Sequence, residues 1–253
     1  MTGWLRVVGL GPGPSRWITP EVTDALAEAS DVIGYRAYVE RLTLGPQQRM
    51  HVSGNGDELQ RAQLALELAQ GGARVVIVSG GDPGVFAMAA AVFEAIERGP
   101  QAWRALEVHV LPGVTAMLAA AARLGAPLGN DFCAINLSDN LKPWSVIETR
   151  LRLTARADLV IALYNPRSRA RPEQLSRALE VLREEKDAAT LVVFARAIGR
   201  PDEALHVTTL AAADPDLVDM RTLVLIAASS TRCIERPDGQ VWLYSPRSLP
   251  EGQ

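Results

Sequence analysis

Hydrophobic positions along the chain follow two patterns that alternate. Short uninterrupted apolar runs predict strands covered on both faces, as in a parallel sheet flanked by helices. In the first half the continuous run is 75–78, and residues 5–10, 31–35 and 106–111 are further strand candidates. Between them apolar residues recur every three or four positions, most clearly over 57–70, where Asp57 precedes the helix and Gly71 ends it. This alternation predicts an α/β fold with a parallel sheet.

The second half has helical patterns over 144–155 and 175–182, but its strands follow in a different order. The strand-like runs are 133–137, 158–164, 190–198, 204–210, 221–229 and 240–244. The last four follow one another without a long helix between them, which indicates antiparallel pairing and a mixed sheet. Two glycines and a proline make 125–132 a turn-rich segment, so we place a boundary there. The expected architecture is two αβα lobes, 1–128 and 129–253.

Composition and charge argue against several classes of protein. The chain has 253 residues, a net charge of −3 and two cysteines, Cys133 and Cys233, without metal-ligand spacing around them. A slightly acidic chain is not typical of a nucleic-acid-binding protein, and two distant cysteines fit a reducing cytoplasm without a metal site. No apolar run approaches the roughly 18 residues of a membrane span. We therefore expect a cytoplasmic protein that binds neither membrane nor nucleic acid.

The chain is organised around residues 73–89, where an apolar run stops at SGGDPG (79–84). Glycines allow a sharp turn and let a ligand approach the main chain. Asp82 is expected at the carboxyl end of a strand, where open α/β sheets bind their ligands. The alternative is that Asp82 caps the helix that follows.

A second glycine-rich segment, GPGP (11–14), does not match a dinucleotide-binding loop. Such a loop needs a helix to begin at the glycines, whereas Pro12 and Pro14 push the residues before them away from helical angles. The first helix is expected later, with Thr19 as its cap and Pro20 in its first turn. A stiff loop of this kind suits lining a cleft better than gripping a phosphate.

Five blocks of sequence resemble, in order, the conserved blocks of the tetrapyrrole (corrin/porphyrin) methyltransferases. They are VVGLGPGPSRWITPEV, SGGDPGVFAMA, LPGVTAMLAAAARLGAPLG, LYNPRS, and ARAIGRPDE together with DMRTLVLIAASST. The resemblance covers essentially the whole chain. It implies two αβα lobes with S-adenosylmethionine in the trough between them, S-adenosylhomocysteine as the product, and a homodimer.

Two segments are most similar to the ring-contracting members of that family, which methylate precorrin-3B at C-17 in aerobic cobalamin synthesis. The segments are GAPLGNDFCAINLSDNLKPW and ALYNPRSRARPEQL. Three alternatives stay open: the equivalent step on a cobalt-containing macrocycle of the anaerobic route, a methyltransferase of the same fold acting on RNA or protein, and a nucleotide-binding protein without turnover.

The resemblance also implies which residues contact the cofactor. They are Pro12, Gly80, Gly81, Asp82, Thr115, Ala116, Asn165, Ala197 and Leu223. Asp82 is expected near the cofactor's polar groups, and Ala197 and Leu223 near its adenine. Asn165 stands where family members often have methionine. A sulfonium methyl is already a strong electrophile, so small residues that orient it and exclude water are sufficient.

The substrate implied by the resemblance carries several carboxylates. Arg167, Arg169 and Arg171 alternate in one loop and suit bidentate carboxylate contacts; the alternative is a solvated basic loop. Ring contraction calls for an acid or base, for which we consider His51, expected on a loop, and Asp131. Asn130, which cannot exchange a proton near neutral pH, stands where many relatives have histidine.

Overall fold

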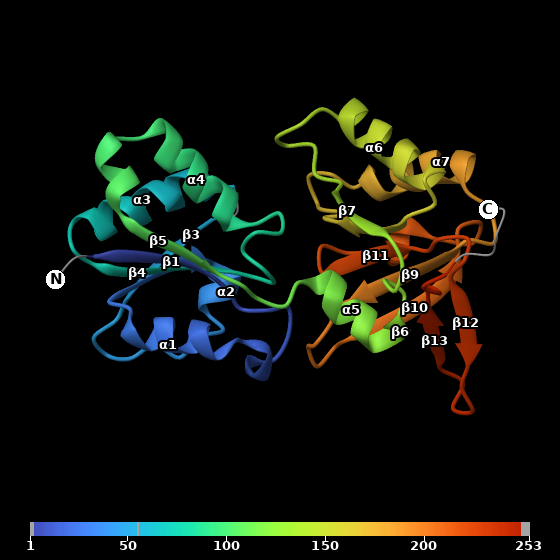
Figure 1. Cartoon of the computed structure of the whole chain (residues 1–253), viewed down its shortest axis with the longest axis horizontal. Coiled ribbons are helices and arrows are strands. Elements are labelled where there is room, and N and C mark those ends of the chain that lie inside the picture. The colour runs from blue at the N-terminus through green and yellow to red at the C-terminus, as the bar shows by residue number, and fades with distance from the viewer. Residues whose placement is uncertain (1–2, 55, 249–253) are drawn as a thin grey trace. The chain divides into compact units, whose positions relative to one another are not determined.

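The computed structural model describes residues 3–54 and 56–248 (Figure 1). It contains two compact units that divide between Thr115 and Ala116. The sequence pattern placed a boundary after residue 128. Helix α5 (Ala116–Leu124) makes the difference, because it contacts strands β11 and β13 of the second unit.

The N-terminal unit is a five-stranded parallel sheet with helices on both faces, in the strand order β3-β2-β4-β1-β5. Its strands are β1 (Trp4–Gly9), β2 (Asp31–Tyr35), β3 (Arg49–Ser53), β4 (Arg74–Ser79) and β5 (Glu107–Leu111). Its helices are α1 (Pro20–Glu28), α2 (Arg36–Val39), α3 (Glu58–Gln70) and α4 (Met88–Arg98), with 3-10 turns η1 (Ser15–Trp17) and η2 (Gln101–Ala105). The parallel sheet predicted from the apolar runs is confirmed.

Alternate residues of the central strands face opposite helical layers. Leu5 and Val7 of β1 belong to the core cluster that contains Val92 of α4. Val8, which follows Val7 and points to the opposite face, belongs to the cluster that contains Val22 of α1. Both layers exclude water, so an uninterrupted apolar run is what such a strand requires. The expected start of α1 is also confirmed: Thr19 Oγ1 accepts a hydrogen bond from the Val22 N–H at 3.3 Å.

The C-terminal unit has a mixed five-stranded sheet in the order β10-β9-β11-β8-β7, in which only β7 and β8 pair in parallel among the described strands. Its strands are β7 (Phe132–Asn136), β8 (Val160–Tyr164), β9 (Leu191–Arg196), β10 (Ala204–Thr209) and β11 (Thr222–Ile226). A small sheet joins β12 (Arg232–Glu235), β13 (Val241–Tyr244) and β6 (Gly125–Ala126), and η3 (Pro215–Leu217) is a 3-10 turn. The predicted mixed sheet is confirmed.

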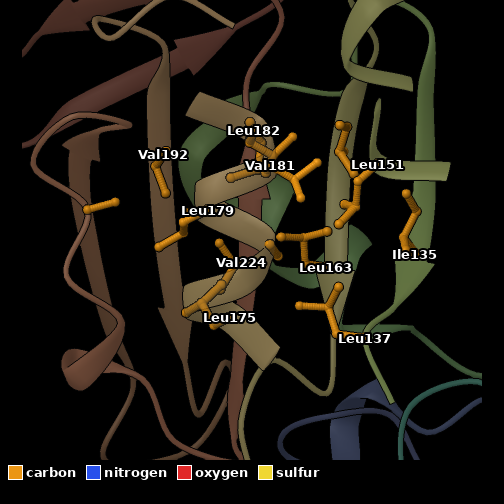
Figure 2. Packing of buried hydrophobic residues seen from close by; sticks show 14 of the residues in the cluster. Ile135, Leu137, Leu151, Leu163, Leu175, Leu179, Val181, Leu182, Val192 and Val224 are labelled. Atoms are coloured by element: carbon orange, nitrogen blue, oxygen red, sulfur yellow. The ribbon is translucent and has the colours of Figure 1, made fainter. Parts of the chain in front are cut away.

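Helices α6 (Trp144–Arg156) and α7 (Gln174–Glu185) supply the core of this unit. Leu175 and Leu179 of α7 lie against the sheet, where Leu163 of β8 and Val224 of β11 belong to the same buried cluster (Figure 2). The apolar positions that predicted α7 are therefore the ones that are buried.

The structure corrects one placement made from the sequence. We expected His51 on a loop, but it is the central residue of strand β3, where it pairs with Ile33 of β2. β3 lies at the edge of the sheet and its residues are exposed or half-buried, so it lacks the apolar run that marks its neighbours.

Candidate functional site

Three loops of the N-terminal unit meet at the carboxyl edge of its parallel sheet. They follow β1, β4 and β5, which are neighbours in the sheet. The Gly11 N–H donates to the Gly81 carbonyl at 3.1 Å, so the first two loops are hydrogen-bonded to each other. The chain leaves β1 toward α1 on one face and β4 toward α4 on the other. Open α/β sheets bind their ligands at such a switch point.

Asp82 ties two of these loops together. Its Oδ1 accepts a hydrogen bond from the Gly84 N–H at 2.8 Å, and its Oδ2 accepts one from the Gly113 N–H at 3.0 Å. Helix α4 begins only at Met88, with Ala87 at the N-cap position. The alternative that Asp82 caps this helix is therefore wrong; its carboxylate fixes the turn after β4 to the turn after β5.

The glycines allow main chain to pack directly on main chain at this edge. A Cβ added to Gly113 would lie 2.4 Å from the Gly81 carbonyl oxygen, and one added to Gly9 would lie 2.5 Å from the same atom. A Cβ on Gly80 would lie 2.7 Å from the ring of Tyr38. Contacts this short are not available to any larger residue without a backbone shift.

Arg41 fixes the first loop, a role that no sequence pattern indicates. Its guanidinium donates to the carbonyls of Leu10 at 3.3 Å, Gly11 at 3.2 Å and Gly13 at 2.7 Å. The contact joins residues about thirty positions apart in the chain, so no local pattern marks it. With Pro12 and Pro14 restricting the backbone, the loop is preorganised.

In the C-terminal unit, four of the predicted cofactor residues gather at one edge of the mixed sheet. Asn165 follows β8, Ala197 follows β9, and Leu223 is the second residue of β11, where it pairs with Ala195. The Ala197 N–H donates to the Arg221 carbonyl at 3.0 Å. Ala116 is the first residue of α5. The N–H of the next residue, Met117, donates to the Tyr164 hydroxyl at 3.1 Å.

Backbone strain concentrates at these edges. Four non-glycine residues of the described chain have positive φ angles. Asn165 (52°) and Ala197 (50°) directly follow β8 and β9, and Phe86 (53°) lies in the loop between β4 and α4. Such conformations cost of order 1–3 kcal/mol each and cluster at functional sites. The Asn165 amide donates to Asn136 Oδ1 at 3.0 Å, which fixes its side chain.

The two predicted acid–base residues are not brought together with these loops. The His51 Nε2 lies 2.8 Å from Asp31 Oδ1, and Asp31 is the first residue of β2, so the ring reaches toward the amino edge of its sheet. Asp131 is exposed and immediately precedes β7, also at an amino end.

Asp31 itself is a fully buried carboxylate at that amino edge. Burial by itself would raise its pKa, but hydrogen bonds from Arg49, His51 and Ser30 outweigh burial and hold the pKa below its ordinary value. The short distances from Arg49 Nε (3.0 Å) and Ser30 Oγ (2.8 Å) fit this direction. We interpret the cluster as the fixed end of β2 and β3.

Two of the three arginines in the loop after β8 form contacts within their own unit. Arg167 Nη1 lies 2.7 Å from Asp216 Oδ1 and donates to the Pro215 carbonyl at 3.0 Å. Arg171 donates to Asn140 Oδ1. Arg169 is exposed and has no ion-pair partner in the part of the chain that the structure describes.

Within residues 3–54 and 56–248, no three His, Cys, Asp or Glu side chains are grouped closely enough to hold a metal ion. Over the same residues, no helix has both the length and the apolar character that crossing a bilayer requires.

Residues 5–214 match the family described as Tetrapyrrole (Corrin/Porphyrin) Methylases, and the chain belongs to this family. It is 57% identical over 248 residues to a Precorrin-3B C(17)-methyltransferase of Sinorhizobium sp, an alignment covering 98% of this chain and 97% of the relative. The crystal structure of the methyltransferase CobJ superimposes with a TM-score of 0.92 at 54% identity, covering 96% of this chain and all of that one. The family and the fold inferred from the five sequence blocks are confirmed.

A more distant relative of known structure is described with a bound ligand. It is a Uroporphyrin-III C-methyl transferase from Thermus thermophilus complexed with S-adenyl homocysteine, with a TM-score of 0.67 at 25% identity. The match covers 89% of this chain and 92% of that chain.

Proposed function

We propose that this chain transfers a methyl group from S-adenosylmethionine to C-17 of precorrin-3B, with contraction of the ring to precorrin-4, in the aerobic route of cobalamin synthesis. The observation that carries the proposal is 57% identity to a Precorrin-3B C(17)-methyltransferase along nearly the full length of both chains. The ring-contracting segments found in the sequence, GNDF (129–132) and LSDNLKPW (137–144), support the same substrate.

For the cofactor, we propose S-adenosylmethionine, bound by the residues named from the resemblance. The ligand of the Thermus thermophilus relative supports it, and so does the character of the two strand edges. Glycine, proline and alanine main chain forms them, and Arg41 and Asp82 hold the first edge rigid. A rigid main-chain surface orients a methyl group and excludes water without a metal or a covalent intermediate. Bound S-adenosylmethionine would supply the activated methyl.

For proton transfer in ring contraction we retain His51 and Asp131 as proposed residues. His51→Gln and Asp131→Asn each remove the exchangeable proton while keeping size and polarity. If either variant contracts the ring at the wild-type rate, that residue is excluded. We further propose, from the family resemblance, a cytoplasmic homodimer that acts on a tetrapyrrole and on no nucleic acid; light scattering of the purified protein tests the dimer.

The function is tested by incubating the purified chain with S-adenosylmethionine and precorrin-3B under exclusion of air. We expect the macrocycle to gain one methyl group by mass, its absorbance to change as the ring contracts, and S-adenosylhomocysteine to appear in equal amount. A reaction lacking S-adenosylmethionine is the control. Absence of methyl gain would reject the proposal.

A parallel incubation with a cobalt-loaded macrocycle decides between the aerobic and anaerobic substrates. We expect turnover on the metal-free substrate to exceed turnover on the cobalt form. The reverse preference would move the chain to the anaerobic step while leaving the methyl transfer intact.

A further inference from the structure

Two loops of the C-terminal unit lie side by side after the parallel strands β7 and β8. The first spans residues 137–143 and the second residues 165–173. Arg171 of the second loop donates to Asn140 of the first, and Gln174, at the start of α7, donates to Asp139 Oδ1 at 3.2 Å. These contacts hold the two loops together.

The first loop is also braced internally. The Ser138 N–H donates to Asn136 Oδ1 at 2.9 Å, and Lys142 Nζ donates to the Ser138 carbonyl at 3.2 Å. With both ends and the middle fixed, the conformation of the tip is set before any ligand arrives. Preorganisation of this kind reduces the entropy that binding has to overcome.

The braced tip presents a leucine to solvent. Leu141 is 98% exposed, the highest value among the large apolar residues of the described chain. An isolated exposed leucine needs no explanation, but a leucine in a loop held by four side-chain hydrogen bonds is presented at a defined position.

The neighbouring loop presents a cation in the same way. Arg167 is paired with Asp216, and Arg171 is engaged by Asn140 and lies near Asp139, with 3.9 Å between Nε and Oδ1. Arg169 stands between these two fixed residues and is exposed. Two of the three arginines therefore position the loop, and the third is left available to an anion.

We propose that Leu141 and Arg169 together recognise the macrocycle: Leu141 packs against its flat apolar face, and Arg169 pairs with one of its peripheral carboxylates. The inference rests on the proposed function, because an exposed leucine and an exposed arginine on two hydrogen-bonded loops match a planar ring that has an apolar face and an anionic rim. It also divides the arginine loop into one substrate-contacting residue and two positioning residues.

The experiment compares Leu141→Ser, Arg169→Gln and Arg169→Lys with two matched controls on α6. The controls are Leu153→Ser, an exposed leucine (59%), and Arg150→Gln, an exposed arginine. Three quantities are measured: the KM for precorrin-3B, the affinity for uroporphyrin III by fluorescence quenching, and the affinity for S-adenosylhomocysteine by calorimetry.

Arg169→Gln should raise the KM and weaken uroporphyrin binding about tenfold, since a charge-assisted hydrogen bond is lost. Leu141→Ser should do so about fivefold, through lost apolar contact. Arg169→Lys should recover part of the effect because it keeps the charge. Affinity for S-adenosylhomocysteine and both control variants should be unchanged.

Failure of this inference is distinct from failure of the proposed function. If the wild type methylates precorrin-3B and the variants keep its KM and its porphyrin affinity, the recognition by Leu141 and Arg169 is rejected. If the wild type binds uroporphyrin with the expected variant effects but does not methylate precorrin-3B, the substrate assignment is rejected and the recognition stands. Absence of both binding and turnover rejects both.

Discussion

Single residues at the carboxyl edge of the first sheet have structural roles that their residue type alone does not reveal. Asp82 has both carboxylate oxygens engaged, by the N–H groups of Gly84 and Gly113. A carboxylate that accepts two main-chain hydrogen bonds stabilises a turn more than a neutral acceptor does. The sequence drew attention to Asp82 for its place after a strand, and the structure supplies the reason for the acid at that place.

Asp82→Asn tests this role. The NH2 group of asparagine would face one of the two main-chain N–H groups, so one hydrogen bond is lost. We expect the free energy of unfolding to fall by about 1–2 kcal/mol. The affinity for S-adenosylhomocysteine should fall as well. Urea unfolding and calorimetry measure the two. Asp24→Asn, on the exposed face of α1, should change neither quantity. An equal loss of stability and affinity in this control would contradict the role assigned to Asp82.

Gly113 offers a sharper steric test. In Gly113→Ala the new Cβ would lie 2.4 Å from the Gly81 carbonyl oxygen, and main chain on both sides must shift. We expect a loss of about 3 kcal/mol in the free energy of unfolding. Gly45→Ala is the matched control, since its nearest atom would be the end of Gln48 at 3.7 Å. Near-equal stabilities of the two variants would contradict the close packing.

Residues that act through tertiary contacts were beyond the reach of sequence patterns. Arg41 contacts carbonyls about thirty positions away, and Leu141 is distinguished only by its exposure. The roles predicted for His51 and Asp131 stay predictions. They were chosen by residue type among few candidates, and residue type does not say toward which end of a sheet a side chain reaches.

At the scale of elements, α6 and α7 are joined by a network of ion pairs. Arg152 contacts Glu184 at 2.7 Å and Glu185 at 3.0 Å, and Arg156 contacts Glu185 at 2.8 Å. Hydrogen bonds from Arg156 and then Arg152 lower the pKa of Glu185 to about 2, from an ordinary value of 4.5.

This shift predicts how stability depends on pH. The folded pKa lies below the unfolded one, so the contribution of Glu185 is fully present above about pH 4.5 and is lost as the pH falls toward about 2. Glu185→Gln should therefore flatten the fall in urea midpoint over that range. Glu180→Gln, an exposed glutamate of α7, should retain the wild-type slope; a wild-type slope in Glu185→Gln would contradict the assignment.

Strands buried on both faces were predictable from their apolar residues, whereas the two-residue strand β6 and the fully exposed strand β12 were not. β1, β2, β4 and β8 are buried on both faces, so burial itself imposes the pattern that sequence reading detects. β12 is exposed at every residue, and β6 has two residues that pair with β13. Their strand character comes from pairing with distant chain, which leaves no periodic signal.

At the scale of the whole molecule, the proposed cofactor residues belong to both compact units. Pro12, Gly80, Gly81, Asp82 and Thr115 lie in the first; Ala116, Asn165, Ala197 and Leu223 lie in the second. The difference between a parallel and a mixed sheet was predictable because helices between strands, or their absence, are visible in the sequence. The place where the chain divides was not, since α5 takes its unit from contacts with β11 and β13.

Hydrogen exchange with and without S-adenosylhomocysteine tests whether both units hold the cofactor. We expect slowed exchange at 80–87 in the first unit and at 164–166 and 196–198 in the second, because binding stabilises the ordered form of each segment. The outer strand β10 serves as the internal reference and should exchange unchanged. Protection confined to one unit would reject the proposed set of residues in the other.

The shared carboxylate of Asp82 has a consequence for engineering. Because one side chain ties the turn after β4 to the turn after β5, these segments cannot be exchanged one at a time. A chimera that imports only residues 80–87 from a relative brings in a carboxylate without the 112–115 turn that it evolved to bind. A chimera that imports only 112–115 leaves Asp82 facing a turn from another protein. Grafts that alter the specificity of this enzyme should carry both segments as one cassette.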